Sequence, residues 1–349
     1  MENKQKKRLA WQIPFLLLLV LGTIFIVMQQ RSMPYQKNSG FVFGTVYNVT
    51  YQSSKNLQKD IENELHKVDD ALSMFNDKSV ISRINQGNCD IDGGEVASMF
   101  VDVFKLAQEI SEDTEGAFDI TVAPLVNAWG FGFKSGDMPS QHSVDSLCQF
   151  VGYQGVNIQQ TGNGWRVKKS DPRIMLDCSA IAKGYGTERV ARLLKKFGVE
   201  NFMVEIGGEV VTCGVSPNRV PWRIGVTKPV DDSLAVDQEV QTVLNVTDRA
   251  MATSGNYRNF YYKGGRKYAH TIDPKTGHPV QHSLLSATVL ANDCGMADAY
   301  ATSFMVMGLE KAKDVLERHA ELMAYFIYTD ADGELATWYS PSLKDKISK

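Results

Sequence analysis

Two oxygen-bearing side chains near the C-terminus have the spacing of a metal site. Asp298 and Thr302 stand four residues apart in the segment DAYAT, so a helix there would place a carboxylate and a hydroxyl on one face. Both groups are oxygen ligands of the kind that suits a hard divalent cation such as Mg²⁺. An isolated pair like this is usually a solvated helix face. We therefore expect a cation here only if a phosphate group binds nearby.

The segment LDCSAIAKGYG, residues 176–186, predicts a site for such a phosphate. We expect a strand to end at Asp177 and a helix to begin within the next several residues. Amide groups at the start of a helix attract anions, and Lys183 could add a positive charge. The alternative is structural, with Asp177 or Ser179 capping the helix.

His270 is the candidate general base. It lies in the segment YAHTIDPKTG, whose Asp-Pro and Thr-Gly pairs predict a turn, so we expect the histidine where a strand enters a loop. Histidine titrates near neutrality, as a general base must. An ordinary loop histidine is the alternative. Phe75 and Phe118 are either core residues or flat surfaces for a planar ring.

The paired glycines Gly207 and Gly208 lie between two apolar strands. They fit either a tight hairpin or a place where the backbone approaches a bulky ligand closely. The segment contains neither GxGxxG nor GxxxxGK[ST], so a Rossmann or Walker site is not supported.

The elements that must position these groups follow no regular β-α-β period, which predicts an α+β fold. Helices are expected over residues 57–72, 96–110, 144–151, 190–197, 296–307 and 310–319. Strands are expected over 41–52, 202–206, 210–214 and 222–227, with hairpins over 155–169 and around a turn at 330–333. No repeat or long linker divides the middle of the chain. We expect one unit over residues 41–340, a polar tether over 32–40 and a tail over 341–349.

Composition excludes several classes of protein. The chain has 349 residues, of which 43% are hydrophobic and 22% charged, so it is neither fibrous nor mostly disordered. Its 37 basic and 40 acidic residues leave a net charge of −3, without the concentrated basic surface that nucleic-acid binding needs. Five cysteines are spread singly, which argues against a cysteine zinc site.

The N-terminus predicts a membrane anchor over residues 1–31. Basic residues at positions 4–8 precede an apolar run from Leu9 to Met28, which as a helix would span about 30 Å, the thickness of a hydrocarbon core. A cleaved secretory signal is the alternative, but no small-x-small site follows the run. We expect an uncleaved signal anchor, a cytoplasmic N-terminus, and everything after Arg31 outside the membrane.

Six segments resemble, in the same order, those of the ApbE-like proteins, the FAD:protein FMN transferases. They are GAFDITVAPLVNAWGFG, LDCSAIAKGYG, VEIGGEV, TSGNYRNFY, HTIDPKTGHPV and DAYAT, within a likeness that covers residues 41–330. The resemblance implies an α+β, T-fold-like domain of two lobes with FAD in the cleft between them. It implies a Mg²⁺-dependent transfer of FMN from FAD to a Thr or Ser hydroxyl of a target protein, with release of AMP.

The resemblance also implies roles for individual residues. His270 matches a histidine that assists deprotonation of the acceptor hydroxyl, and Asp298 is essential as a metal ligand. The other metal ligands would be Thr302 and the backbone oxygens of Ala180 and Ala301. Contacts to FAD would come from Phe43, Phe75, Ala117, Phe118, Asp119, Asp177, Lys183 and Ile272. Phe43 and Phe75 depart from the Met and Tyr of many relatives, which removes a phenol hydroxyl at Phe75.

The implied partners are FAD and an acceptor protein, a subunit of a respiratory ion pump or a related electron-transfer protein. With the predicted anchor, the catalytic domain would lie on the periplasmic side of a bacterial inner membrane. Two other functions remain open from the sequence. A metal-dependent FAD pyrophosphatase would use water in place of the hydroxyl, and a non-catalytic flavin carrier would bind without turnover.

Overall fold

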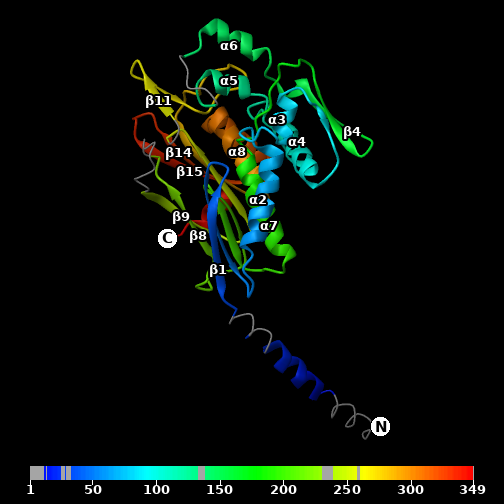
Figure 1. The fold of residues 1–349 in the computed structure, drawn as a ribbon. Helices are drawn as coiled ribbons and strands as arrows, with labels where there is room; N and C mark the ends of the chain where they lie inside the picture. Colours follow the sequence, from blue (N-terminus) through cyan, green and yellow to red (C-terminus); the bar gives the residue numbers. More distant parts are fainter. Residues whose placement is uncertain are drawn as a thin grey trace, which may run out of the picture.

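The computed structural model describes residues 12, 14–24, 28, 33–132, 138–229, 239–257 and 260–348. Eight antiparallel strands form the central sheet, in the order β1-β2-β6-β7-β10-β13-β14-β15 (Figure 1). Their bounds are β1 Tyr35–Val42, β2 Thr45–Gln52, β6 Phe202–Ile206, β7 Glu209–Cys213, β10 Ala250–Gly255, β13 Leu284–Ala291, β14 Met323–Thr329 and β15 Leu335–Tyr339.

The central strands of this sheet are buried on both faces, because they carry apolar side chains on each face. Ala252 and Val289 belong to the cluster that packs under the helices. The adjacent residues Met251 and Leu290 belong, with Tyr325, to a separate cluster on the opposite face. A sheet buried on both faces reads as nearly continuous apolar segments.

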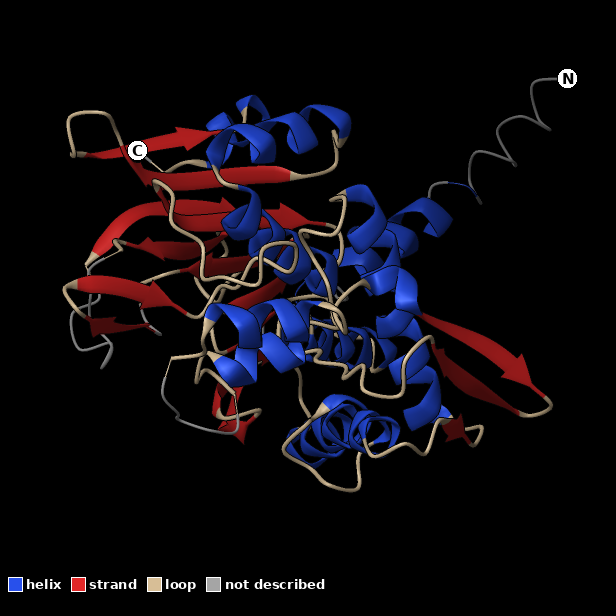
Figure 2. Cartoon of the chain, turned by 90° about the horizontal axis from the view of Figure 1, so that it is seen from above, coloured by secondary structure: helices blue, strands red, loops and turns tan. Residues whose placement is uncertain are grey.

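Helices cover one face of the sheet (Figure 2). Helices α7 and α8 contact the strands directly, and α2 and α4 pack outside them. The bounds are α2 Gln58–Leu72, α3 Val80–Asn85, α4 Glu95–Asp113, α5 Ala123–Ala128, α6 Gln141–Cys148, α7 Ala182–Lys196, α8 Cys294–Met307 and α9 Leu309–Arg318. This grouping of helices on one side of an antiparallel sheet confirms the predicted α+β class.

Three smaller sheets complete the fold. The hairpin of β8 (Trp222–Thr227) and β9 (Val240–Val246) covers the second face of the central sheet. Strands β3 (Asp90–Ile91), β4 (Val156–Thr161) and β5 (Gly164–Lys169) form another sheet, and β11 (Phe260–Lys263) pairs with β12 (Arg266–Ala269). The predicted hairpin over residues 155–169 is thus confirmed.

Several expectations need correction. The single strand over 41–52 is a hairpin, because Phe43 and Gly44 both have positive φ and turn the chain back on itself. Most of the expected tether is therefore strand β1. No strand ends at Asp177, since the side-chain amide of Asn85 bonds both backbone groups of Leu176 in place of a neighbouring strand. The expected tail contains the 3₁₀ helix Pro341–Lys346, whose Leu343 is fully buried.

Part of the predicted membrane anchor lies outside the described residues. Residues 14–24 are helical, and their large apolar side chains are exposed by 49% or more. Within the part of the chain that the structure describes, no helix combines the length and the apolar character needed to cross a membrane.

Candidate active site

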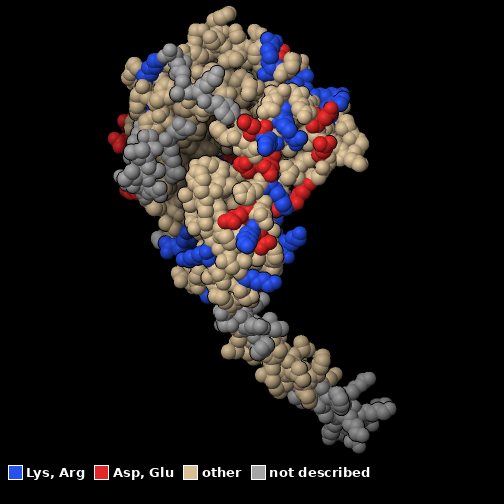
Figure 3. Space-filling model, viewed as in Figure 1, with Lys and Arg blue, Asp and Glu red and all other residues tan. Residues whose placement is uncertain are grey.

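A cavity of about 760 Å³ brings together segments that are far apart in the sequence. Its walls include residues from the segments 117–122, 177–183, 205–210, 251–257, 270–274 and 298–306, among others. The surface is hollowed beside the helices in Figure 3. The volume suits a cofactor-sized ligand.

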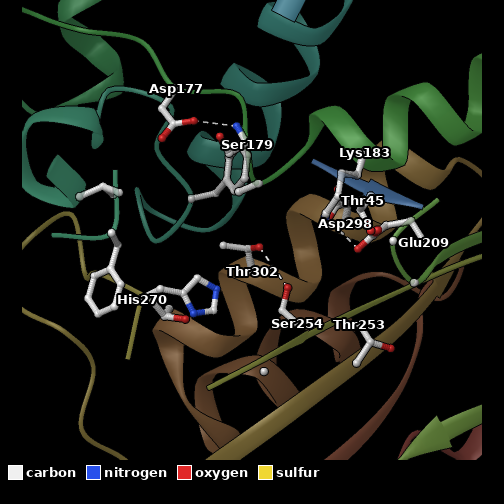
Figure 4. A pocket seen from close by; sticks show the side chains of 18 of the residues that line it. Thr45, Asp177, Ser179, Lys183, Glu209, Thr253, Ser254, His270, Asp298 and Thr302 are labelled. Carbon is white, nitrogen blue, oxygen red and sulfur yellow. Dashed lines mark hydrogen bonds and ion pairs between the residues drawn. The ribbon is translucent and has the colours of Figure 1, made fainter. Parts of the chain in front are cut away.

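Three charged side chains meet in the wall of this cavity (Figure 4). Lys183 Nζ lies 2.9 Å from Oε1 of Glu209 and 3.7 Å from Oδ2 of Asp298. The same Oδ2 accepts a hydrogen bond of 2.9 Å from the backbone N–H of Gly184, at the start of α7. The start of α7, where we expected an anion, is therefore already in contact with a carboxylate of the protein.

Burial changes the pKa of each of these groups. Desolvation raises the pKa of Glu209 to about 7, with Asp298 adding to the effect and Lys183 opposing it. Desolvation also raises the pKa of Asp298, against the opposing effect of Lys183. Burial alone would lower the pKa of Lys183, but the carboxylates of Asp298 and Glu209 outweigh it and raise that pKa. The raised pKa favours the protonated, ammonium form of Lys183.

The predicted pair on α8, Asp298 and Thr302, lies in the cavity wall, and the four-residue spacing places both on the same helix face. The side chain of Asp298 is only 3% exposed, and Thr302 Oγ1 lies 3.1 Å from Oγ of Ser254. Both protein contacts to Asp298 fall on Oδ2, so neither engages Oδ1. The described residues contain no cluster of three or more His, Cys, Asp or Glu side chains that could hold a metal ion.

These donors nevertheless fit Mg²⁺, which keeps several waters and is commonly bound by one or two carboxylates together with substrate phosphates. Asp298 and Thr302 supply hard oxygen atoms on one helix face, and Ala180 lines the cavity nearby. Ala301 is fully buried inside α8 and is not among the lining residues.

His270 lines the same cavity, directly after β12. Its ring contacts Phe131 edge-on, with centroids 6.4 Å apart. The Asp-Pro turn beyond it forms as predicted, because Asp273 accepts hydrogen bonds from the backbone of Lys275 and the hydroxyl of Thr276. In Figure 4, Thr302 lies between His270 and Asp298.

Two further predicted carboxylates have mainly internal partners. Asp119 accepts three hydrogen bonds, from the backbone and hydroxyl of Thr121 and from the backbone of Tyr153. Asp177 accepts one from the backbone N–H of Ser179 at 2.7 Å. Burial raises the pKa of both groups, and these hydrogen bonds oppose the shift.

The remaining predicted FAD contacts divide into two groups. Phe75, Ala117, Phe118 and Ile272 line the cavity, and Phe75 is 74% exposed while Phe118 is 2% exposed. Phe43 is not among the lining residues. Its ring packs against α7, where a Cβ on Gly186 would come within 2.6 Å of it.

Sequence reasoning did not single out Glu209 or Ser254. Glu209 could have been found from the sequence, because it begins the apolar strand β7 and a buried acidic side chain needs a charged or hydrogen-bonding partner. Ser254 lies in the segment TSGNYRNFY, where nothing in the local sequence distinguishes it from its neighbours. Its contact with Thr302 joins β10 to α8 and could not be predicted from local spacing.

Comparison with known proteins identifies the family. The ApbE family model matches residues 43–326, which is most of the chain. The chain belongs to the ApbE family.

Similar proteins cover nearly the whole length of this ApbE member. A curated FAD:protein FMN transferase of Vibrio cholerae is 38% identical over 320 residues, which cover 89% of this chain and 92% of that protein. One of Escherichia coli K12 is 32% identical over 341 residues, covering 94% and 95% of the two chains.

Solved structures agree with this assignment. The flavin transferase ApbE of Vibrio cholerae has a TM-score of 0.77 at 35% identity and covers 90% of this chain and 99% of its own. The apo flavinyl transferase ApbE of Pseudomonas stutzeri has the same TM-score at 30% identity, covering 90% and 97%. The resemblance read from the six segments is confirmed, and the chain is an enzyme of the transferase class.

Proposed function

We propose that this chain is a Mg²⁺-dependent transferase that moves the FMN half of FAD onto a Ser or Thr hydroxyl of a target protein and releases AMP. The observation that carries the proposal is the convergence of Asp298, Thr302, Lys183 and His270 on one cavity from three separate parts of the chain. The names of the relatives support FAD as the substrate.

Phosphoryl transfer depends mainly on positioning and on neutralising charge. Asp298, Thr302 and the backbone of Ala180 would hold the cation, with Ala301 proposed as a further ligand through its backbone. A bound Mg²⁺ would neutralise charge on the diphosphate of FAD. Lys183 adds a positive charge at the same wall.

His270 would receive the proton of the acceptor hydroxyl. The hydroxyl oxygen then forms a bond to the phosphorus of the FMN half, and the bond from that phosphorus to the bridging oxygen breaks. The bridging oxygen leaves with AMP, so that the flavin ends in a phosphoester on the target. Phe75, Ala117, Phe118 and Ile272 supply the apolar part of the wall, where we propose that the flavin ring binds.

Product analysis separates this proposal from the two other functions. The purified chain is incubated with FAD and Mg²⁺, with and without an acceptor that carries a Ser/Thr-Gly-Ala-Thr-like segment. Flavin fluorescence that stays on the denatured acceptor, with one AMP per flavin, is the expected result. AMP and free FMN without labelled acceptor would mean hydrolysis, and retained FAD without AMP would mean a carrier.

We further propose that residues 1–31 anchor the chain in a bacterial inner membrane, with the catalytic domain on the periplasmic side. The exposed apolar side chains of residues 14–24 support this proposal, because they lack a covering layer in the fold. The acceptor would then be a periplasmic segment of a respiratory ion pump or a related electron-transfer protein.

A further inference from the structure

Lys183 lies between two buried carboxylates but does not contact them equally. Its Nζ is 2.9 Å from Oε1 of Glu209 and 3.7 Å from Oδ2 of Asp298 (Figure 4). Both carboxylate side chains are 3% exposed, whereas Lys183 is 30% exposed. The ammonium of Lys183 therefore lies closer to Glu209 than to Asp298. Without Glu209, it would pair with Asp298 alone.

The backbone around Glu209 fixes this arrangement. Glu209 pairs with Ile206 across the two-residue turn Gly207-Gly208, so its position is set by the sheet. Gly207 has φ of +62°, and a Cβ there would approach Cγ2 of Thr45 to 2.7 Å. The turn is thus held tightly against β2, and Glu209 cannot shift away from the cavity without distorting the hairpin.

Glu209 is not fully satisfied by this contact. Its second oxygen, Oε2, is buried and has no hydrogen-bond partner among the described residues. A buried carboxylate that served only to stabilise the fold would be expected to have both oxygen atoms paired. An unpaired oxygen in the wall of the cavity indicates a role in the site.

We propose that Glu209 is a positioning residue that holds Lys183 away from Asp298. It leaves the Asp298 carboxylate open to a divalent cation and keeps the ammonium beside the path of an incoming diphosphate. Glu209 acts through Lys183, and this inference rests on the proposed cation site at Asp298. Without Glu209, the ammonium closes on Asp298 and competes with the cation for it.

The test is isothermal titration calorimetry, in which MgCl₂ alone, without FAD, is added to the purified full-length chain. Four proteins are compared: wild type, Glu209→Gln, Lys183→Met and the double variant. Glu209→Gln is expected to weaken Mg²⁺ binding about 10-fold, a change that corresponds to about 1.4 kcal/mol. Lys183→Met is expected to bind Mg²⁺ at least as tightly as wild type, because the competing ammonium is gone.

The double variant decides whether the effect passes through Lys183. In the Lys183→Met background, Glu209→Gln is expected to weaken binding by no more than about threefold. Equal losses in both backgrounds would overturn the proposal, because Glu209 would then act on the cation by its charge directly. Unchanged Mg²⁺ binding in Glu209→Gln would also overturn it. Absence of Mg²⁺ binding in the wild type would overturn the cation site itself, and this inference with it.

A matched control separates this effect from a general loss of negative charge. Glu205 lines the same cavity but accepts hydrogen bonds from Asn48 Nδ2 at 2.8 Å and from the N–H of Gly208 at 2.9 Å. Glu205→Gln is expected to change Mg²⁺ affinity less than twofold. Thermal unfolding without Mg²⁺ checks that each variant folds. If Glu209→Gln does not fold, Glu209→Asp replaces it, because aspartate keeps the charge on a shorter side chain. Glu209→Asp is expected to weaken Mg²⁺ binding two- to fivefold. Unchanged binding in Glu209→Asp would overturn the proposal.

Discussion

At the scale of single residues, the carboxylates in the cavity wall fall into two groups: those with an oxygen atom that no contact from the described residues occupies, and those whose two oxygen atoms both accept hydrogen bonds from the protein. Asp298 belongs to the first group, since neither protein contact to its carboxylate uses Oδ1. Asp119 belongs to the second, because its carboxylate joins residues 119–121 to the start of the 3₁₀ helix Tyr153–Gly155. The sequence likeness placed both among the site residues and could not separate their roles.

Asp298→Asn should remove most of the Mg²⁺-dependent transfer. The amide oxygen can still accept from Gly184, so the fold is retained, while the charge proposed to bind the cation is lost. We expect the rate to fall by about 100-fold or more, measured as AMP release. Asp293→Asn is the control on the same helix. Asp293 is the N-cap of α8, and asparagine caps a helix equally well, so an equal loss of rate there would contradict the assignment.

Asp119→Ala should mainly destabilise the protein. It leaves two backbone amides and one hydroxyl without their acceptor in a buried place, which costs about 2–4 kcal/mol of unfolding free energy. Urea denaturation measures this loss. Asp332→Ala, at an exposed turn, should change stability by less than about 0.5 kcal/mol. Similar values for the two variants would show that Asp119 does not hold these loops.

At the scale of elements, the site depends on the close approach of α7 and α8. A Cβ on Gly184 would lie 2.3 Å from the backbone oxygen of Cys294 and 2.7 Å from Cβ of Asp298. Both contacts are shorter than real Cβ atoms allow, so only glycine permits this helix spacing. The hydrogen bond from Gly184 to Asp298 depends on the same spacing.

Gly184→Ala should therefore move α8 away from α7 and lower both stability and transfer. We expect a loss of about 2–4 kcal/mol in unfolding free energy and at least 10-fold in rate. Gly225→Ala is the control for stability, because its nearest side-chain atoms lie at an ordinary 3.5 Å. A Gly184→Ala protein with wild-type melting temperature and rate would contradict this packing argument.

A polar cluster around His319 links helices α4, α8 and α9. Ring nitrogens of His319 lie 3.0 Å from Asp113 and from Glu321, and Tyr300 and Arg318 also contact Asp113. Burial lowers the pKa of His319, but these two carboxylates outweigh it and raise that pKa above its usual 6.5. A raised histidine pKa stabilises the fold below the unfolded pKa, and this stabilisation is lost as the pH rises through the folded value.

His319→Gln should remove this pH dependence. The difference in unfolding free energy between wild type and variant should be larger near pH 5.5 than near pH 9, by about 0.5–1 kcal/mol. Denaturant titrations at the two pH values measure it. A difference that grew toward high pH would contradict the assigned direction of the pKa shift.

Local patterns predicted most elements, and long-range contacts account for what was missed. The helices around Leu65, Phe104 and Val190 were predicted because their apolar residues repeat on one face. The strand expected before Asp177 does not form, since the bonds of Leu176 go to a side chain 91 residues away. Strand β1 was missed because its polar sequence reads as a tether until β2 pairs with it.

At the scale of the whole molecule, the site too combines pairs that local sequence patterns predict with contacts that only the folded chain creates. Asp298 and Thr302 were predicted as a pair because they share one helix face, which is local information. The ion pair of Lys183 with Glu209 joins α7 to β7, and no local sequence pattern predicts it. His270 was predicted at a strand end, but only the folded chain brings it to the same cavity as α8.

The proposed anchor also belongs to this scale. Deletion of residues 1–31 should move the protein from the membrane fraction to the soluble fraction of the cell without reducing transfer in the purified protein. Fractionation and the AMP assay measure the two effects. A truncated protein that stays with the membrane would contradict the anchor. Removal of residues 35–42 instead should destabilise the sheet, because they form β1.

Diffraction from crystals soaked with FAD and Mn²⁺, an ion that can be located by its anomalous signal, tests the central claim most directly. We expect FAD in the 760 Å³ cavity, with its diphosphate beside α8 and an anomalous peak at Asp298 and Thr302. Flavin bound at another surface, or FAD in the cavity with no ion beside Asp298, would contradict it.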